Sequence, residues 1–219
     1  PSGDVILWLA HSLADNALVG QHVLLPMRFH VDQVETKSAL SFNALVDPRY
    51  HGQGIWTGLG RKAHDEATDR GTAMTYGIPN PNSHRPMVRE LEYRAVFDVP
   101  VLVKPLNPGQ AVRKVMPGLL GNLAAPAADL IRPLMFPKAR VPAGAGTVEP
   151  VDRFDAGFDV LAGRAATRYR VLLLRNAAHL NWRYVDCPTR TTRRWAVRSG
   201  ERVDGYAVLR VTDFRGLRM

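Results

Sequence analysis

The sequence predicts a layered α/β (α+β) domain, followed by part of a second α+β domain. Over residues 1–106, short apolar segments typical of strands alternate with single segments of helical spacing, which favours a sheet flanked by helices. Residues 107–150 are rich in proline, glycine and alanine, and strand-like and helical segments resume over 151–219. We therefore expect a first domain at 1–106, a linker or packing arm at 107–150, and the incomplete start of a second, similar domain at 151–219.

The composition is that of a soluble globular protein, because 46% of the 219 residues are hydrophobic and 22% are charged. Cys187 is the sole cysteine, which excludes an internal disulfide framework and suits the reducing cytoplasm. No apolar run approaches the roughly 20 residues that span a bilayer, so no membrane partner is expected. The net charge of +9 favours anionic partners, and both a polyphosphate and a nucleic acid fit it. The chain opens at Pro1 almost directly on a strand-like segment, and we expect further residues upstream.

The elements of the first domain follow from apolar runs bounded by turn residues. These runs predict strands over residues 5–12, 17–31, 38–46 and 72–79, with one or two more over 93–106. A helix is predicted over 54–70, because Ile55, Leu59 and Ala63 recur at helical spacing and Gly71 can end the helix. A shorter helix is predicted over 83–91, with Ser83 as its cap.

In the second half, proline spacing within 107–150 permits only a short central helix. Beyond it, the pattern predicts helices over 151–166 and 170–186 and strands over 193–200 and 204–211. These last strands repeat an N-terminal pattern, since Trp195 and Gly205 are placed much as Trp8 and Gly20 are. A duplication and an accidental match of two hairpins both fit the repeat. A duplicate of this kind would dock on the first half or on another chain, because its sheet edge would be unprotected.

The segment most informative about function is Arg49-x-x-Gly52-x-Gly54, which lies between the strand at 38–46 and the helix that follows. Glycines at this spacing let consecutive backbone N–H groups point into one concavity, and the helix adds the positive end of its dipole. Arg49 supplies a countercharge, so the segment can hold a pyrophosphate. It is neither a GxxxxGK[ST] loop nor GxGxxG, because no lysine-serine pair follows and the glycines stand at 52, 54, 58 and 60. An ordinary turn remains the alternative.

In context, LVDPRYHGQGIWTGLGRKAHDEATDRG resembles the acyl-CoA loop of the GNAT acetyltransferase superfamily. The family's signature, Arg or Gln, two residues, Gly, one residue, Gly or Ala, is matched by Arg49, Gly52 and Gly54. The segment MTYGIPNPNS resembles the family's fifth strand with its asparagine-bearing exit. The resemblance covers residues 5–106 and implies a mixed, mostly antiparallel central sheet flanked by helices. The repeat in the second half implies a tandem GNAT-like protein, truncated at both ends.

The resemblance implies an acyl-CoA-dependent N-acyltransferase that uses acetyl-CoA as co-substrate, needs no metal and acts on an amine. The strand at 41–46 would splay from the next one, so that its free edge pairs with the pantetheine arm. Backbone amides of the glycine loop would take the pyrophosphate, and an N–H near Val46 would hold the developing oxyanion. The acyl-CoA-binding residues implied in this way are Leu45, Val46, Arg49, Gly52, Gln53, Gly54, Ile55 and Asn82.

The catalytic residue is not identified by the sequence. The family commonly has an acid tyrosine where Val88 stands, and Tyr93 aligns with the aromatic residue of the family's lGF pattern. His84 and Glu90 could act as acid or base, although two solvated helix residues are the simpler interpretation. The strand and helices that usually form the acceptor side are also absent before Pro1. A non-catalytic acyl-CoA-binding or protein-interaction module therefore stays open as the alternative function.

Two further classes of site were weighed. The histidines show no metal-ligand spacing with Cys187 or with acidic pairs, so no metal site is expected. The segment RTTRRWAVRSGER interleaves arginines with a tryptophan, as nucleic-acid-binding surfaces do, but a solvated strand edge is favoured. Nucleic acid is therefore not the expected partner. The acceptor, the acyl length and the oligomeric state are not determined by the sequence.

Overall fold

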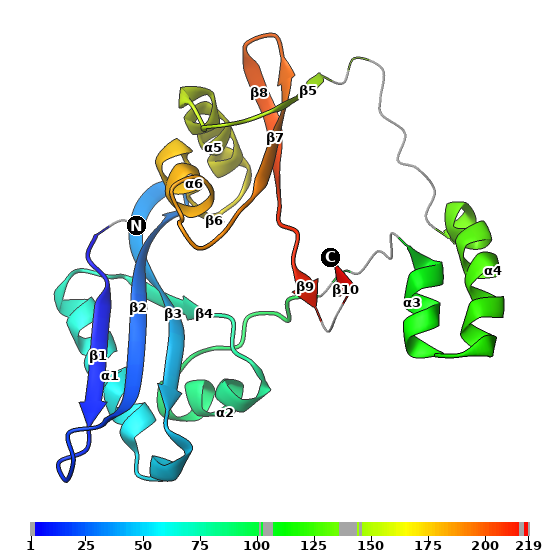
Figure 1. Cartoon of the computed structure of the whole chain (residues 1–219). Coiled ribbons are helices and arrows are strands. Elements are labelled where there is room, and N and C mark those ends of the chain that lie inside the picture. The colour runs from blue at the N-terminus through cyan, green and yellow to red at the C-terminus, as the bar shows by residue number, and fades with distance from the viewer. Residues whose placement is uncertain are drawn as a thin grey trace. The chain divides into compact units, whose positions relative to one another are not determined.

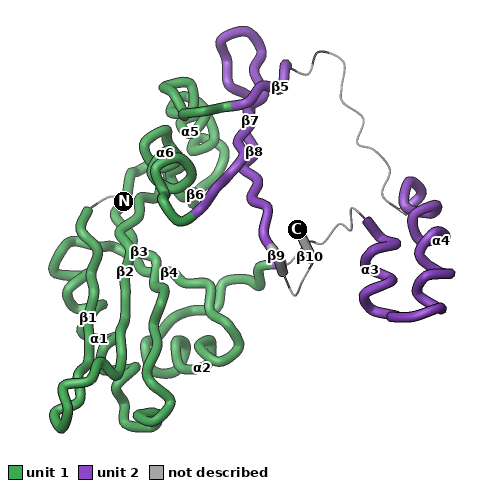
Figure 2. The backbone as a smooth tube through the Cα atoms, viewed as in Figure 1, with its two compact units in different colours: residues 1–99, 151–189 green, residues 100–150, 190–219 purple. Residues whose placement is uncertain are grey.

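The computed structural model describes residues 3–100, 102, 107–135, 144, 146–214 and 217–218. The chain forms two compact units, one of residues 1–99 and 151–189 and the other of residues 100–150 and 190–219 (Figure 2). These units differ from the three segments expected from the sequence, because residues 151–189 pack with the first half. The expected domain boundaries stay a prediction.

The first unit is built on a mixed, mostly antiparallel sheet (Figure 1). Its strands are β1 (Ile6–His11), β2 (Leu18–Val31), β3 (Val34–Val46), β4 (Met74–Gly77) and β6 (Val171–Leu173). The order is β1-β2-β3-β4, with β6 paired to β2, and only the β3–β4 pairing is parallel within this sheet. The predicted fold class is therefore confirmed.

The helices of the first unit are α1 (Ile55–Asp69), α2 (Pro81–Glu90), α5 (Ala156–Arg168) and α6 (Ala177–Tyr184). The helix predicted at 54–70 is confirmed, and Gly71 follows it with φ of 76°. The short helix begins two residues earlier than predicted, because Asn80 rather than Ser83 is its N-cap. Asn80 accepts from the N–H of Ser83, and the Ser83 hydroxyl accepts from the N–H of Asn80, which forms a capping box.

Two expectations for this unit were wrong. Residues 171–173 form strand β6 instead of opening a helix at 170, because they pair with β2, where Val31 lies opposite Val171. The ion pair of Arg170 with Asp32 fixes the same junction. No strand forms over 93–100, and residues 101 and 103–106 lie outside the described part of the chain. Val96 and Phe97 are 82% and 78% exposed, so this apolar segment packs on no strand among the described residues.

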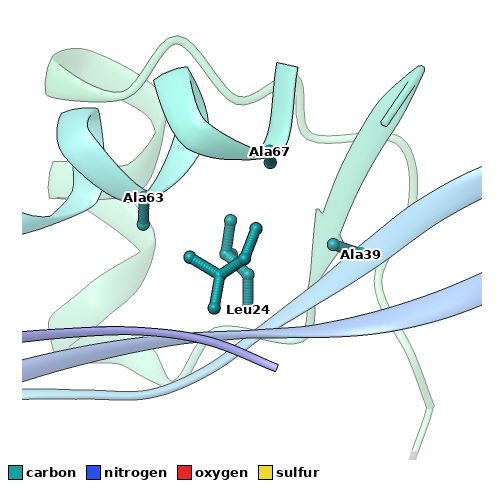
Figure 3. Close-up of a cluster of buried hydrophobic side chains, with 5 residues drawn as sticks. Leu24, Ala39, Ala63 and Ala67 are labelled. Atoms are coloured by element: carbon teal, nitrogen blue, oxygen red, sulfur yellow. The ribbon is translucent and has the colours of Figure 1, made fainter. Parts of the chain in front are cut away.

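The core of the sheet lies beneath α1. Leu24 of β2 is fully buried against Ala63 and Ala67, which stand one turn apart on α1 (Figure 3). Ala39 of β3 and Ile6 of β1 complete this cluster. Small side chains on α1 let the helix approach the sheet closely, and the helix is thereby fixed over the central strands.

A buried polar cluster continues this interface toward the C-terminal end of β3. His22 on β2 is 1% exposed, and its Nε2 lies 3.1 Å from the hydroxyl of Ser41 on β3. His64 on α1 has its Nε2 2.8 Å from the hydroxyl of Tyr93, and the rings of His22 and His64 lie 5.9 Å apart. Burial, together with a smaller effect of the neighbouring His64, lowers the pKa of His22 to about 4. Neutral imidazoles therefore link α1 to both β2 and the segment after α2.

Tyr93 reaches this cluster through a strained turn. Glu92 has φ of 58°, in the left-handed region that side chains other than glycine seldom adopt. The N–H of Tyr93 then donates to the carbonyl of Met87 and closes the end of α2. The unfavourable backbone conformation of Glu92 directs the Tyr93 side chain toward His64 on α1.

The described part of the second unit contains a helical pair, a three-stranded sheet and a separate two-stranded sheet. Its helices are α3 (Pro108–Val115) and α4 (Leu119–Met135), and its strands are β5 (Thr147–Pro150), β7 (Arg193–Ser199), β8 (Arg202–Leu209), β9 (Asp213–Phe214) and β10 (Leu217–Arg218). The N–H of Gly109 donates to Asp129 at 2.8 Å and joins the helical pair. Within the described ranges, no helix is both long and apolar enough to cross a bilayer.

The expectation of only a short helix in 107–150 was wrong, because α4 continues through Pro126 and Pro133. Each proline removes one intrahelical hydrogen bond. The leucine- and alanine-rich sequence has high helix propensity, which offsets this loss.

The repeat seen in the sequence has a structural counterpart. In the β1–β2 hairpin, Ala10 lies opposite Gly20 and the register shifts directly after Ala10. In the β7–β8 hairpin, Val197 lies opposite Gly205 and the register shifts directly after Val197. The bulges therefore fall at corresponding positions of the two hairpins, which supports the duplication hypothesis.

The first prediction concerns acid stability. Because the pKa of His22 is about 4 in the folded protein and 6.5 when exposed, its contribution is complete above pH 6.5 and is lost as the pH falls toward 4. We expect His22→Gln to reduce the difference in unfolding free energy between pH 7.5 and pH 5 by about 2 kcal/mol. Urea titrations at the two pH values measure this. His11→Gln, at an exposed position, is the control, and an unchanged difference for His22→Gln would contradict the buried neutral imidazole.

The second prediction concerns the turn at Glu92. Glycine adopts positive φ without a Cβ clash, so Glu92→Gly should raise the free energy of unfolding by about 1 kcal/mol. Urea denaturation checks this. Arg89→Gly, within α2, should instead lower it by about 1 kcal/mol. A loss of stability in Glu92→Gly would show that the turn is not strained.

Candidate functional site

The site begins where β3 and β4 part. Their parallel pairing runs from Ser38 opposite Met74 to Ser41 opposite Gly77, and then β4 ends. Residues 42–46 of β3 continue beyond this point with no described strand on that side. The expected splay at 41–46 therefore has a structural basis in the length of β4.

The end of β4 is determined by Gly77-Ile78-Pro79-Asn80. Pro79 lacks an N–H and keeps Ile78 from a helical conformation, and Asn80 then caps α2. A Cβ at Gly77 would lie 2.8 Å from Cε of Met87, so glycine lets α2 pack closely on the strand end. The chain thus leaves the sheet abruptly, and the N-terminal end of α2 flanks the gap.

The free edge of β3 directs backbone groups into this gap. Asp47 donates its N–H to the carbonyl of Val19 on β2 at 2.8 Å. Because strand residues alternate, the N–H and C=O of Val46 point away from β2. The ring Nε2 of His51 lies 3.0 Å from the carbonyl oxygen of Val46, which can only accept, so the imidazole donates this bond.

The loop after β3 makes a single 3-10 turn, η1 (Pro48–Tyr50), before α1. Asp47 caps this turn and accepts from the N–H of Arg49 at 2.9 Å. Gly52 and Gly54 have φ of 77° and 73°, so both lie in the left-handed region. Glycine adopts this region without a Cβ clash, so both positions suit glycine.

The N-terminus of α1 faces the same gap. Gly54 is its N-cap and provides no side-chain hydrogen bond. The Gly58 N–H donates to the carbonyl of Gly54 and starts the helical bonding pattern, so the N–H groups of residues 55–57 have no intrahelical acceptor. Such a helix end attracts anions through its free N–H groups and the helix dipole.

These elements enclose a pocket of about 690 Å³. Its size lies within the range of small-molecule sites, roughly 300–1,000 Å³. Of the residues implied by the resemblance, the pocket brings together Leu45, Val46, Gly52, Gly54, Ile55 and Asn82. Arg49 and Gln53 do not line it.

Apart from Glu90, which the sequence offered as an acid or base, the other lining residues were not implied by the resemblance: Ala44, Tyr50, His51, Trp56, Thr57, Asn80, Ser83 and Pro86. Helical spacing could have identified one group of them, because Asn82, Pro86 and Glu90 recur every four residues along one face of α2. A smaller pocket of about 280 Å³, lined by residues of β2 and β3, shares Leu45 and Val46 with the larger one.

Arg49, which was expected to supply a countercharge for a phosphate, is instead paired with a carboxylate of the chain. Arg49 forms a bidentate ion pair with Asp47, at 3.1 Å from Nε and 2.8 Å from Nη2. Hydrogen bonds from Arg49 lower the pKa of Asp47 to about 2. Glu90 is the one carboxylate among the lining residues, and it accepts a hydrogen bond from the hydroxyl of Thr57.

The residues weighed for acid–base roles are separated by the structure. Val88 and His84 are not among the residues that line the pocket, whereas Glu90 is. Tyr93 lies in the buried cluster with His64, and burial raises the pKa of its hydroxyl. Among the residues with described placement, no three His, Cys, Asp or Glu side chains gather as a metal site would require.

Comparison with known proteins shows which family and which solved structures this chain resembles. A family model for the acetyltransferase (GNAT) domain matches residues 2–96. No curated protein sequence matches the chain significantly. Among solved structures, a conserved protein of unknown function from Enterococcus faecalis, described as a probable N-acyltransferase, is similar over 90% of this chain at 15% identity, with a TM-score of 0.55. The match covers 43% of that protein's length, so the likeness is one of fold.

Two further solved structures match less closely. A predicted acetyltransferase from Clostridium acetobutylicum, crystallised with acetyl-CoA, has 17% identity over 45% of this chain and 64% of its own, with a TM-score of 0.39. Glucosamine-6-phosphate N-acetyltransferase from Arabidopsis thaliana has 8% identity over 46% of this chain and 68% of its own, with a TM-score of 0.40. Residues 2–96 are thus similar in sequence to the GNAT acetyltransferase domain, and the mixed, mostly antiparallel sheet agrees with that match.

Proposed function

We propose that the first unit binds acyl-CoA, with acetyl as the expected acyl group, and transfers the acyl group to an amine. The observation that carries this proposal is the pocket, in which the unpaired edge of β3, the glycine loop and the N-terminus of α1 converge. The three parts match the chemistry of CoA, whose pantetheine arm contains amides and whose pyrophosphate is anionic. The reducing state implied by Cys187 suits a thioester enzyme of the cytoplasm.

In this proposal the backbone does most of the binding. The C=O of Val46, which points away from β2, accepts from a pantetheine amide, as in an added strand. His51 must then release the carbonyl of Val46. The free N–H groups at the start of α1 hold the pyrophosphate, which the N-terminal dipole stabilises.

The acyl transfer needs little further machinery. The nitrogen lone pair of the amine attacks the thioester carbonyl, the C–S bond breaks, and the thiolate leaves. The N–H of Val46 faces the gap and is suited to stabilise the developing oxyanion. The proton lost by the amine ends on the thiolate.

Ligand binding tests the proposal. A thermal-shift panel of acetyl-CoA, dephospho-CoA, pantetheine, ATP and NAD should show stabilisation by acetyl-CoA and dephospho-CoA alike and weak stabilisation by pantetheine. At ligand concentrations of about 100 times the Kd, stabilisation should approach 2.7 kcal/mol. Equal effects of pantetheine and acetyl-CoA would contradict the phosphate assignment, and stabilisation by ATP alone would indicate a nucleotide site.

The third prediction concerns Gly54. A Cβ there has open space around it, so the cost of substitution comes from its φ of 73° and from the ligand that would occupy the space. We expect Gly54→Val to weaken CoA binding at least about tenfold, or 1.4 kcal/mol, and to lower stability by about 1–2 kcal/mol. Gly58→Ala, on the same helix with open space and an ordinary φ, is the matched control and should leave CoA affinity unchanged. Calorimetry at one pH measures both, and equal affinities for Gly54→Val and wild type would contradict the site.

A second candidate function is a non-catalytic acyl-CoA-binding module. The observation that favours it is Val88, a non-ionisable residue at the position where the resemblance places an acid tyrosine.

The fourth prediction follows from Val88. Transfer to a panel of simple amines should be much slower than about 10 per second, a typical enzyme turnover, despite measurable acetyl-CoA binding. A thiol-release assay measures the rate. Rapid turnover would show that another residue supplies the proton, and Glu90→Gln, His84→Ala and Tyr93→Phe would then identify it.

A further inference from the structure

Two carboxylates of the chain contact side chains next to the proposed pyrophosphate site. Asp47 holds the guanidinium of Arg49, and Glu90 accepts from the hydroxyl of Thr57, the third residue of α1. Asp47 and Arg49 lie on the loop before α1, whereas Glu90 comes from the last turn of α2. One carboxylate therefore lies at the N-terminal end of α1, and the other is paired with the arginine of the loop that precedes this helix.

Glu90 compensates a helix end that has no cap of its own. Gly54 has no side chain to accept from the first N–H groups of α1, and the first turn of α1 contains no acidic residue. A carboxylate beside Thr57 supplies negative charge near this end, where the helix dipole favours it. A bound pyrophosphate would supply the same charge, and it would repel the ionised Glu90.

Asp47 neutralises the cation on which the loop motif depends. The side chain of Arg49 is 78% exposed, yet its Nε and Nη2 both bond the Asp47 carboxylate. The carboxylate offsets the charge of Arg49, so a phosphate that contacts the remaining N–H groups of Arg49 gains less than it would from an unpaired guanidinium. Arg49 itself does not line the pocket.

We propose that Asp47 and Glu90 are specificity-determining residues that reduce the preference of the pocket for phosphate-bearing ligands over the uncharged pantetheine arm. The inference rests on the proposed function, since it concerns the same pocket. The helix N-terminus and the glycine loop attract the pyrophosphate of CoA. The negative charges of Asp47 and Glu90 weaken this attraction, so CoA dissociates more readily. Backbone pairing along β3 contributes equally to CoA and to pantetheine, so it leaves the ratio of the two affinities unchanged.

Conservative substitutions separate this charge effect from structural roles. Asp47→Asn keeps an oxygen that can accept from the N–H of Arg49 and cap η1. Glu90→Gln keeps an oxygen for the hydroxyl of Thr57. Asp69→Asn removes the same charge from the far end of α1 and serves as the matched control for long-range electrostatics. Circular dichroism and melting curves confirm that each variant is folded.

The experiment is calorimetric titration of wild type and the variants with CoA and, separately, with pantetheine. We expect each substitution to raise CoA affinity about twofold to fivefold, as removal of one exposed charge contact does. The double variant should gain about the product of the two factors, because the contacts share no atom. Pantetheine affinity and the Asp69→Asn control should stay unchanged. The gains should shrink at 0.5 M salt, where charges are screened within about 4 Å.

Two results would overturn the inference. One is an unchanged or lower CoA affinity in both single variants while wild type binds CoA better than pantetheine, which leaves the proposed function standing. The other is a parallel rise in pantetheine affinity, which would assign the effect to pocket shape. If neither wild type nor any variant binds CoA, the proposed function falls and the inference falls with it.

Discussion

The short parallel pairing of β3 and β4 is the constraint on which the site depends. It ends at Ser41 and Gly77, and the residues that line the pocket lie beyond that point. If β4 were longer, it would cover the edge of β3 and satisfy the outward-facing groups of Val46 internally. Pro79 and the Asn80 cap prevent this, because they end β4 and begin α2. The early end of β4 leaves a free sheet edge beside a helix N-terminus.

The interface beneath α1 determines where that helix N-terminus lies. Ala63 and Ala67 allow close packing on Leu24, and the His22–Ser41 and His64–Tyr93 contacts extend the same interface to the parting strands. Close packing fixes the position of the helix, and the polar contacts add directional constraints. The glycine loop is then held between two fixed points, the end of β3 and the start of α1. Its positive φ angles follow from joining these points over few residues.

Local signals explain how much of this was predictable from the sequence. The strands up to β4, helix α1 and the glycines at 52 and 54 follow from periodicity and turn chemistry, which depend on neighbouring residues. The strand predicted at 93–106 and the helix predicted from residue 170 failed over the described residues, because strand formation depends on a distant partner. The contacts of Asp47 and Glu90 also lay beyond sequence reasoning. Whether Arg49 faces a ligand or a carboxylate depends on side-chain geometry, which spacing along the chain does not determine.

The central claim is that the free edge of β3 and the N-terminus of α1 together receive CoA. Backbone amide NMR during a CoA titration tests it most directly, because it reports each N–H separately. The account predicts the largest shifts at Ala44 and Val46 and at Ile55, Trp56 and Thr57, with the amides of β7 and β8 unaffected. With pantetheine, the shifts at Ala44 and Val46 should persist while those at the start of α1 largely vanish. Binding of CoA with shifts confined to other parts of the chain, and none at these five amides, would contradict the account.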